Sequence, residues 1–199
     1  MQEERLFSVR DFAWSVGRTG SSMPITCRRR VQSESASFAT DASSRSTSRT
    51  FASPCSTMKA MVLKAPGSAL TLENVPDPTP GPGDVVLRVR ATSLNYHDVF
   101  TRRGMPGIKV PMPCIMGLDF AGEIVALGAD VDPTWRVGQR VMVDPVDREG
   151  PGGLLGEMRP GGLAQFCAVP AHQLIELPAE VSYEAASCLP VAYGTAVRM

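Results

Sequence analysis

The chain has 199 residues, and its 20 basic and 20 acidic side chains balance, so nothing in its charge points to nucleic acid as a partner. Its five cysteines are scattered and never form a C-x-x-C pair, which argues against a disulfide framework or a zinc lobe and indicates free thiols in a reducing compartment. No apolar run approaches the roughly 18 residues that span a bilayer, so we expect a soluble protein without a membrane partner.

The first 57 residues differ in composition from the rest of the chain. They hold eight Arg, no Lys and five acidic residues, and their second half is dominated by Ser, Thr and Arg. Because such a segment buries too little apolar surface to offset its ordering entropy, we expect it to be disordered or to be a mitochondrial or plastid transit peptide. A start at Met23 would match a transit peptide better than the start at Met1. A start at Met58 is the alternative, and without a transit peptide the location would be cytoplasmic.

The folded region is expected to begin at Met58 with β structure. Residues 59–65 and 69–75 are short apolar-rich runs joined by a Pro-Gly-Ser turn, which predicts a strand pair. After a Pro-rich turn, residues 85–91 alternate apolar side chains with two arginines, as in a half-buried strand.

A short helix is expected over residues 96–103. Asn95 is a residue type that caps helices, and Asp98 places a carboxylate in the first turn, where the helix dipole favours it. Gly104 ends the helix. Three prolines then predict a surface loop up to residue 114.

The next strand is expected to run from Ile115 to Gly128 and to bend, because Gly117 and Gly122 interrupt an apolar run. Glycine inside a strand marks a bend, a bulge or the close approach of another backbone.

Further β segments and two helices complete the pattern. Residues 162–170 and 174–178 read as strands that close the sheet structure, after a Gly- and Pro-rich region at 144–162. Ser182 can cap a helix over residues 183–189, and Pro190 suits the first turn of a final helix.

Two of these stretches resemble the signatures of the medium-chain dehydrogenase/reductase superfamily, whose catalytic domain is GroES-like. Asn95-Tyr96-His97-Asp98 stands where zinc alcohol dehydrogenases read C-x-x-D, and Gly117-Leu118-Asp119-Phe120-Ala121-Gly122 stands where they read G-H-E-x-x-G. In those enzymes the Cys and the His bind zinc. The pattern here is similar to that of the zinc-independent quinone oxidoreductase branch.

The resemblance implies that the chain binds no metal. The two ligand positions hold Asn95 and Leu118, the third falls near Val191, and residues 144–162 lack the four cysteines of the zinc lobe. A site made from His97, Cys114 and Asp119 is conceivable from residue types alone, although a scattered His and Cys are more often packed than ligating.

For the fold, the resemblance implies a mainly β, GroES-like, partly open β-barrel with short helices over residues 58–180, after the N-terminal segment 1–57. Residues 181–199 would be the first helices of an α/β Rossmann domain. In this family the G-x-G-x-x-G turn that seats the cofactor pyrophosphate lies a few tens of residues further on. We therefore expect a fragment that is inactive alone.

The function implied for the intact relative is NADPH-dependent reduction of a small-molecule carbonyl, quinone or enone, without zinc, in a possible homo-oligomer formed through the missing domain. A zinc-type alcohol dehydrogenase and a non-catalytic GroES-like binding module are the alternatives. The choice between NADPH and NADH stays open, and so does the substrate.

Four residues are candidates for the site, none of them singled out as catalytic. Asn95 is a candidate for the substrate pocket and for cofactor binding, with helix capping as its structural role. Tyr96 either points into the pocket or packs in the core, and Asp119 either orients a pocket water or bonds nearby N–H groups. Thr195 stands where the family's Thr touches the nicotinamide side of the cofactor, unless it only bonds the helix backbone.

Overall fold

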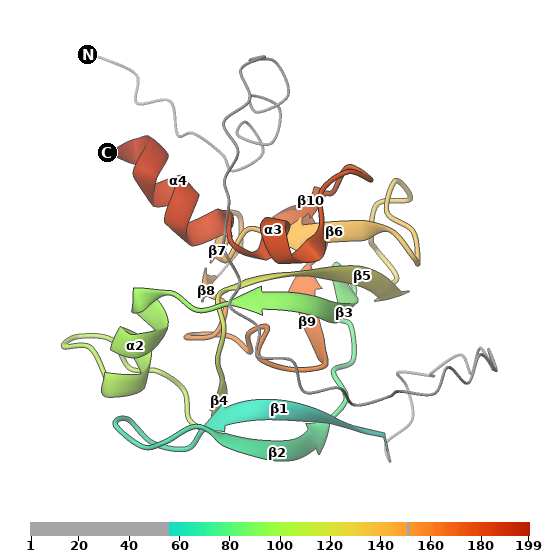
Figure 1. The fold of residues 1–199 in the computed structure, drawn as a ribbon. Coiled ribbons are helices and arrows are strands. Elements are labelled where there is room, and N and C mark those ends of the chain that lie inside the picture. The colour runs from blue at the N-terminus through green and yellow to red at the C-terminus, as the bar shows by residue number, and fades with distance from the viewer. Residues whose placement is uncertain (1–55, 151) are drawn as a thin grey trace, which may run out of the picture.

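The computed structural model describes residues 56–150 and 152–199 of the chain (Figure 1). The expectations of disorder, of a transit function and of a start at Met23 concern residues that lie outside the described ones. The first strand begins at Thr57, one residue before the boundary expected at Met58.

The described strands form three antiparallel sheets, which confirms the mainly β architecture. One sheet has the order β2 (Thr71–Pro76), β1 (Thr57–Leu63), β4 (Cys114–Ile115). A larger sheet has the order β10 (Leu174–Glu176), β6 (Arg140–Val143), β5 (Asp119–Leu127), β3 (Asp84–Ser93), β9 (Phe166–Pro170). The third is the hairpin of β7 (Val146–Asp147) and β8 (Gly153–Leu154). Within the described ranges the sheets are not closed into a barrel, so the expected barrel is open there.

The described helices are short, as expected: α2 (Tyr96–Arg103), the 3₁₀ turn η1 (Ala171–Gln173), α3 (Tyr183–Ser187) and α4 (Pro190–Arg198). Ser182 caps α3, because its hydroxyl accepts the N–H of Ala185 at 3.2 Å. Figure 1 shows α3 lying over the larger sheet and α4 projecting from it toward the C-terminus. Among the described helices, none has the length and apolar character that crossing a membrane requires.

The expected strand over residues 115–128 is two strands that belong to different sheets. Gly117 separates them with φ of +102°, a left-handed conformation that a side chain would strain, and a Cβ there would meet the backbone of Leu163 at 2.7 Å. Gly122 lies inside β5, and a Cβ there would collide with the carbonyl of Arg88 on β3. The glycines therefore mark a turn and a close backbone approach, as the sequence indicated.

The core lies on both faces of the larger sheet at the start of β3. Val85 and Leu87 are fully buried in the main core cluster with Phe120, whereas Val86 is buried in a second cluster with Met58. The expectation of a half-buried strand holds only for the later part of β3, where Arg90 is exposed. Covering both faces fixes the register of β3 and β5, and with it the position of the segment that precedes β5.

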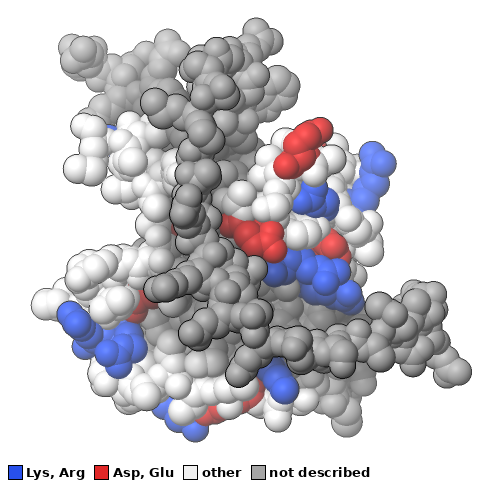
Figure 2. Space-filling model, in the orientation of Figure 1, with Lys and Arg blue, Asp and Glu red and all other residues white. Residues whose placement is uncertain are grey.

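Charged groups of both signs are interspersed on the described part of the face seen in Figure 2, and no extensive patch of one sign appears on that part of it.

Candidate functional site

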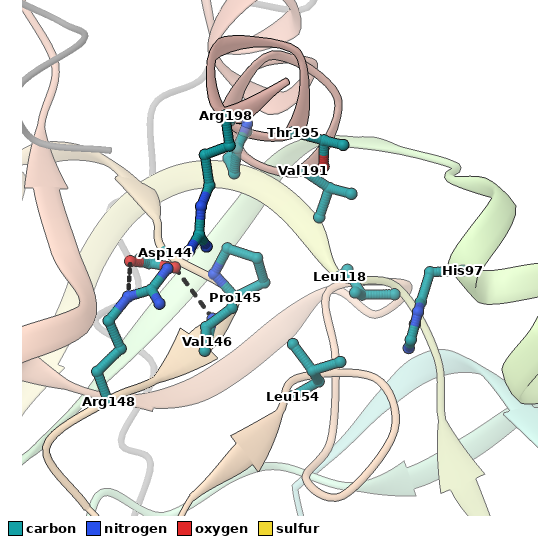
Figure 3. A pocket seen from close by; sticks show the side chains of 12 residues that line it. His97, Leu118, Asp144, Pro145, Val146, Arg148, Leu154, Val191, Thr195 and Arg198 are labelled. Carbon is teal, nitrogen blue, oxygen red and sulfur yellow. Dashed lines mark hydrogen bonds and ion pairs between the residues drawn. The ribbon is translucent and has the colours of Figure 1, made fainter. Parts of the chain in front are cut away.

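A cavity of about 200 Å³ lies where α2, the segment before β5, the region from β6 to β8, and α4 meet (Figure 3). Leu118, Val191 and His97 lie on one side of it, and Asp144, Arg148 and Arg198 gather on the other. The cavity is smaller than the roughly 300–1,000 Å³ typical of ligand pockets, so it accommodates a ring-sized group.

Leu118 and Val191 form part of the apolar side of the cavity. Leu118 is 1% exposed and follows the turn at Gly117. Val191 lies in the first turn of α4, where Pro190 supplies the fixed φ that starts a helix. Thr195 lies one turn after Val191 and also lines the cavity.

The charged side of the cavity is organised by Asp144, just after β6. Its Oδ1 accepts the N–H of Val146 at 3.0 Å, and its Oδ2 lies 3.5 Å from Nε of Arg148. Arg198 comes from the last turn of α4. The two arginines and one carboxylate leave an excess of positive charge beside the apolar side.

Asp119 holds two of these elements together from behind the cavity. Its Oδ2 accepts hydrogen bonds from Nδ2 of Asn95 and from the backbone N–H of Val191, each at 3.0 Å. The carboxylate thus connects the residue before α2 to the start of α4. Burial raises the pKa of its carboxyl to about 6, although the hydrogen bonds from Val191 and Asn95 oppose that shift. Its buried Oδ1 has no hydrogen-bond partner among the described residues.

The four candidate residues occupy different places. Thr195 lines the cavity, whereas Asn95, Tyr96 and Asp119 do not. Asn95 precedes α2, and its backbone N–H donates to Oδ2 of Asp98 at 2.8 Å. Tyr96 is 75% exposed, so the expectation that it packs in the core was wrong; its ring lies edge-on to Phe100, with 5.4 Å between ring centroids. A direct role of these residues toward substrate or cofactor stays a prediction.

Sequence reasoning missed the polar pair formed by His97 and Glu157. Nε2 of His97 lies 2.7 Å from Oε2 of Glu157, 60 residues further along the chain, and His97 lines the cavity. The histidine inside the stretch Asn95-Tyr96-His97-Asp98 could have been noticed from the sequence. Its partner could not, because no local sequence pattern predicts a contact 60 residues away.

The conceivable metal site of His97, Cys114 and Asp119 is not assembled. Each of the three has other partners: Sγ of Cys114 donates to the carbonyl of Gly156 at 3.5 Å. Among residues 56–150 and 152–199, no three His, Cys, Asp or Glu side chains are placed to hold a metal ion.

Residues 81–179 match the family model of the alcohol dehydrogenase GroES-like domain. The chain is 35% identical over 136 residues to the chloroplast envelope quinone oxidoreductase homolog of Arabidopsis thaliana, and this match covers 66% of the chain and 38% of the relative. The chain thus spans about two fifths of that relative's length.

Solved structures show the same fold. A crystal structure of an NAD-dependent alcohol dehydrogenase matches with a TM-score of 0.67 and 31% identity, over 71% of this chain and 46% of that one. A putative zinc-binding dehydrogenase from Sinorhizobium meliloti 1021, bound to NADP, matches with a TM-score of 0.59 and 27% identity, over 66% of this chain and 42% of that one.

Proposed function

The chain belongs to the medium-chain dehydrogenase/reductase superfamily, and on that premise we propose that its cavity is the substrate side of the active site of an NADPH-dependent quinone or enone reductase that works without zinc. The observation that carries the proposal is the apolar side made by Leu118 and Val191 at two positions where zinc enzymes of the family carry ligands. A flat, weakly polar ring fits that side better than a hydrated metal does.

The reduced nicotinamide would supply the hydride. Its site has support in the chain: Thr195 offers a hydroxyl at the cavity, and Arg148 and Arg198 offer cations that suit an anionic cofactor. The protein's part is to exclude water on the apolar side and to fix the substrate ring against the α4 side, since hydride transfer needs an approach of roughly 3 to 3.5 Å. The cavity holds one ring, so the rest of a dinucleotide needs a larger binding surface than it provides.

We propose that no zinc takes part, because of the three positions only Asn95 carries a side-chain donor or acceptor, and its amide nitrogen is bonded to Asp119. Metal analysis of the purified chain after dialysis against a chelator tests this point. Zinc well below one per chain is the expected result. Stoichiometric zinc would instead favour the zinc-type alcohol dehydrogenase. One structural neighbour is described as a putative zinc-binding dehydrogenase.

A plastid or mitochondrial location is part of the proposal. The Arabidopsis relative is named for the chloroplast envelope, and the Ser- and Arg-rich second half of residues 1–57 supports a transit segment. N-terminal sequencing of the protein from cells should give a mature chain that begins near Met58. A mature chain that begins at Met1 would contradict this location.

The activity is tested with two forms of the protein. The chain of 199 residues is titrated calorimetrically with NADPH, and the same chain joined after Met199 to the dinucleotide-binding domain of the Arabidopsis relative is assayed with several quinones and enones. We expect weak or absent NADPH binding by the first form and turnover by the second. Tight NADPH binding by the chain, or inactivity of the joined form with every substrate, would favour the binding-module alternative.

A further inference from the structure

His97 and Glu157 form a partly buried acid–base pair, and the histidine is its member that lines the cavity. His97 lies in the first turn of α2 and its side chain is 27% exposed, whereas the Glu157 side chain in the turn after β8 is 5% exposed. The histidine lines the cavity and the carboxylate does not. Figure 3 shows the ring descending from α2 on the same side of the cavity as Leu118 and Leu154.

The pair is held in place by a third group. Oγ1 of Thr101, one turn after His97 on α2, donates to Oε2 of Glu157 at 3.2 Å, while Nε2 of His97 lies 2.7 Å from the same oxygen. A buried carboxylate is costly unless it is paired and hydrogen-bonded, and His97 is the basic side chain that lies against Glu157 in the described structure. This arrangement favours an Nε2–H facing Glu157.

The second ring nitrogen has no partner within the described structure. Nδ1 of His97 has no hydrogen bond to another described residue, so in the doubly protonated ring it carries a proton without a partner among them. The neighbouring Cys114 thiol does not compete for this role, because burial first and the charge of Glu157 second raise its pKa to about 11. The proton at Nδ1 is therefore the one that a ligand oxygen can take.

We propose that His97, positioned by Glu157 and Thr101, donates the proton that completes the reduction, an inference that rests on the proposed function. Hydride arriving at the electrophilic carbon breaks the π bond, and the electron pair moves to the substrate oxygen. That oxygen takes the proton from Nδ1, so an O–H bond forms, the N–H bond breaks, and the imidazole keeps the electron pair. The substrate is reduced, the nicotinamide is oxidised, and His97 regains a proton from solvent.

Other charged groups near the His97 ring affect the charge of the cavity in which this proton transfer would occur. Asp98 follows His97 on α2, and Asp144, Arg148 and Arg198 line the other side of the cavity. The two arginines favour an oxyanion in the cavity before the proton arrives.

A spectroscopic test needs no turnover, because the chain has two histidines, His97 and His172. In the full chain labelled with ¹⁵N-histidine, the ring signals are assigned with His172→Gln. We expect His97 to carry its proton on Nε2 when neutral, and Glu157→Gln to change the ring ¹⁵N signals of His97 without changing those of His172. A neutral Nδ1–H form of His97, or no response to Glu157→Gln, would overturn the pairing.

A kinetic test uses the chain joined to the dinucleotide-binding domain, with duroquinone as the substrate. His97→Ala should lower kcat about 100-fold with little change in KM, as general acids contribute about 10²- to 10⁴-fold. Added imidazole should restore part of the loss and the solvent isotope effect should change, results that a structural role does not give. The control Glu176→Gln should stay within about twofold, since Glu176 is exposed on β10 and does not line the cavity.

The outcomes separate the two proposals. An inactive wild-type joined form overturns the reductase function and the proton role together. An active wild-type form whose His97→Ala variant keeps its kcat, its pH profile and its solvent isotope effect overturns the proton role alone.

Discussion

Asp119 is the residue at which the fold and the site meet. It is fully buried, it bonds Asn95 on one side and Val191 on the other, and its second oxygen has no partner among the described residues. Sequence reasoning weighed two roles for this carboxylate, bonds to nearby N–H groups and the orientation of a pocket water. The bonds it makes are to groups 24 and 72 residues away, so the carboxylate connects distant parts of the chain.

We predict that Asp119→Asn stabilises the protein above pH 6. Burial raises the folded pKa to about 6 from an ordinary value near 4, so the carboxyl contributes stability that is complete below about pH 4 and is lost as the pH rises to about 6. The asparagine has no charge to bury. Chemical denaturation should show a gain on the order of 2 kcal/mol at pH 7.5 and almost none at pH 4.

The control for this prediction is Glu176→Gln, which removes an exposed carboxylate from β10. It should leave the free energy of unfolding nearly unchanged at both pH values. An equal gain for Asp119→Asn at pH 4 and pH 7.5 would contradict an ionisation effect and point to packing instead.

Elements are positioned here by glycines and by one loop carboxylate. The alternation of residues 85–91 and the residues around α2 predicted a strand and a helix well, because those signals are local. The division of residues 115–128 between two sheets was not predictable, since it depends on β4 pairing with β1 and β5 pairing with β3. The contact between His97 and Glu157 was not predictable for the same reason, because the two residues are 60 positions apart and meet only in the folded chain.

Gly122→Ala should be strongly destabilising. A Cβ at this position of β5 collides with the carbonyl of Arg88 on the paired strand, and backbone cannot move aside as a flexible side chain can. We expect a loss of at least about 2 kcal/mol in the free energy of unfolding, the range of overpacking in a core. Gly83→Ala is the matched control, because a Cβ there has nothing within 4 Å, and it should cost almost nothing.

Asp147 organises the loop between β7 and β8. Its Oδ1 lies 2.9 Å from Nε2 of His172 and accepts the N–H of Gly150 at 2.8 Å, and its Oδ2 lies 3.5 Å from Arg159. Burial alone would raise the pKa of this carboxyl, but the bonds from His172 and the loop amides lower it below its ordinary value.

We therefore predict that Asp147→Ala loosens this loop. The variant should be cut faster by a protease within residues 144–160 and should lose about 1–3 kcal/mol of stability, because it leaves several donors unpaired. Glu149→Gln is the control, because Glu149 bonds Asp147 through its backbone N–H, which the substitution keeps. Unchanged proteolysis of Asp147→Ala would show that the loop is held by other contacts.

At the scale of the whole molecule, Arg140 fixes the segment that leads into the C-terminal helices to the sheet. Arg140 on β6 donates to the carbonyls of Pro178 and Ala179 at 3.2 and 3.0 Å and to that of Val181, and its guanidinium lies over the Tyr183 ring at 4.6 Å. Tyr183 in turn donates its hydroxyl to Glu123 on β5 at 3.0 Å. The segment that leads into α3 and α4 is thus fixed to the sheet, and α4 supplies one side of the cavity.

Arg140→Lys should release this segment even though it keeps the positive charge. A lysine ammonium cannot reach three carbonyls and stack on a ring at once, because those contacts use the planar fork of the guanidinium. We expect faster hydrogen exchange in α3 and α4 and a loss of about 1–3 kcal/mol, with the β1–β2 pair unaffected. Arg90→Lys is the control, since Arg90 makes one part-exposed ion pair with Glu123. If α4 exchanges no faster in Arg140→Lys than in Arg90→Lys, the bond from Val191 to Asp119 is sufficient to hold α4 at the cavity.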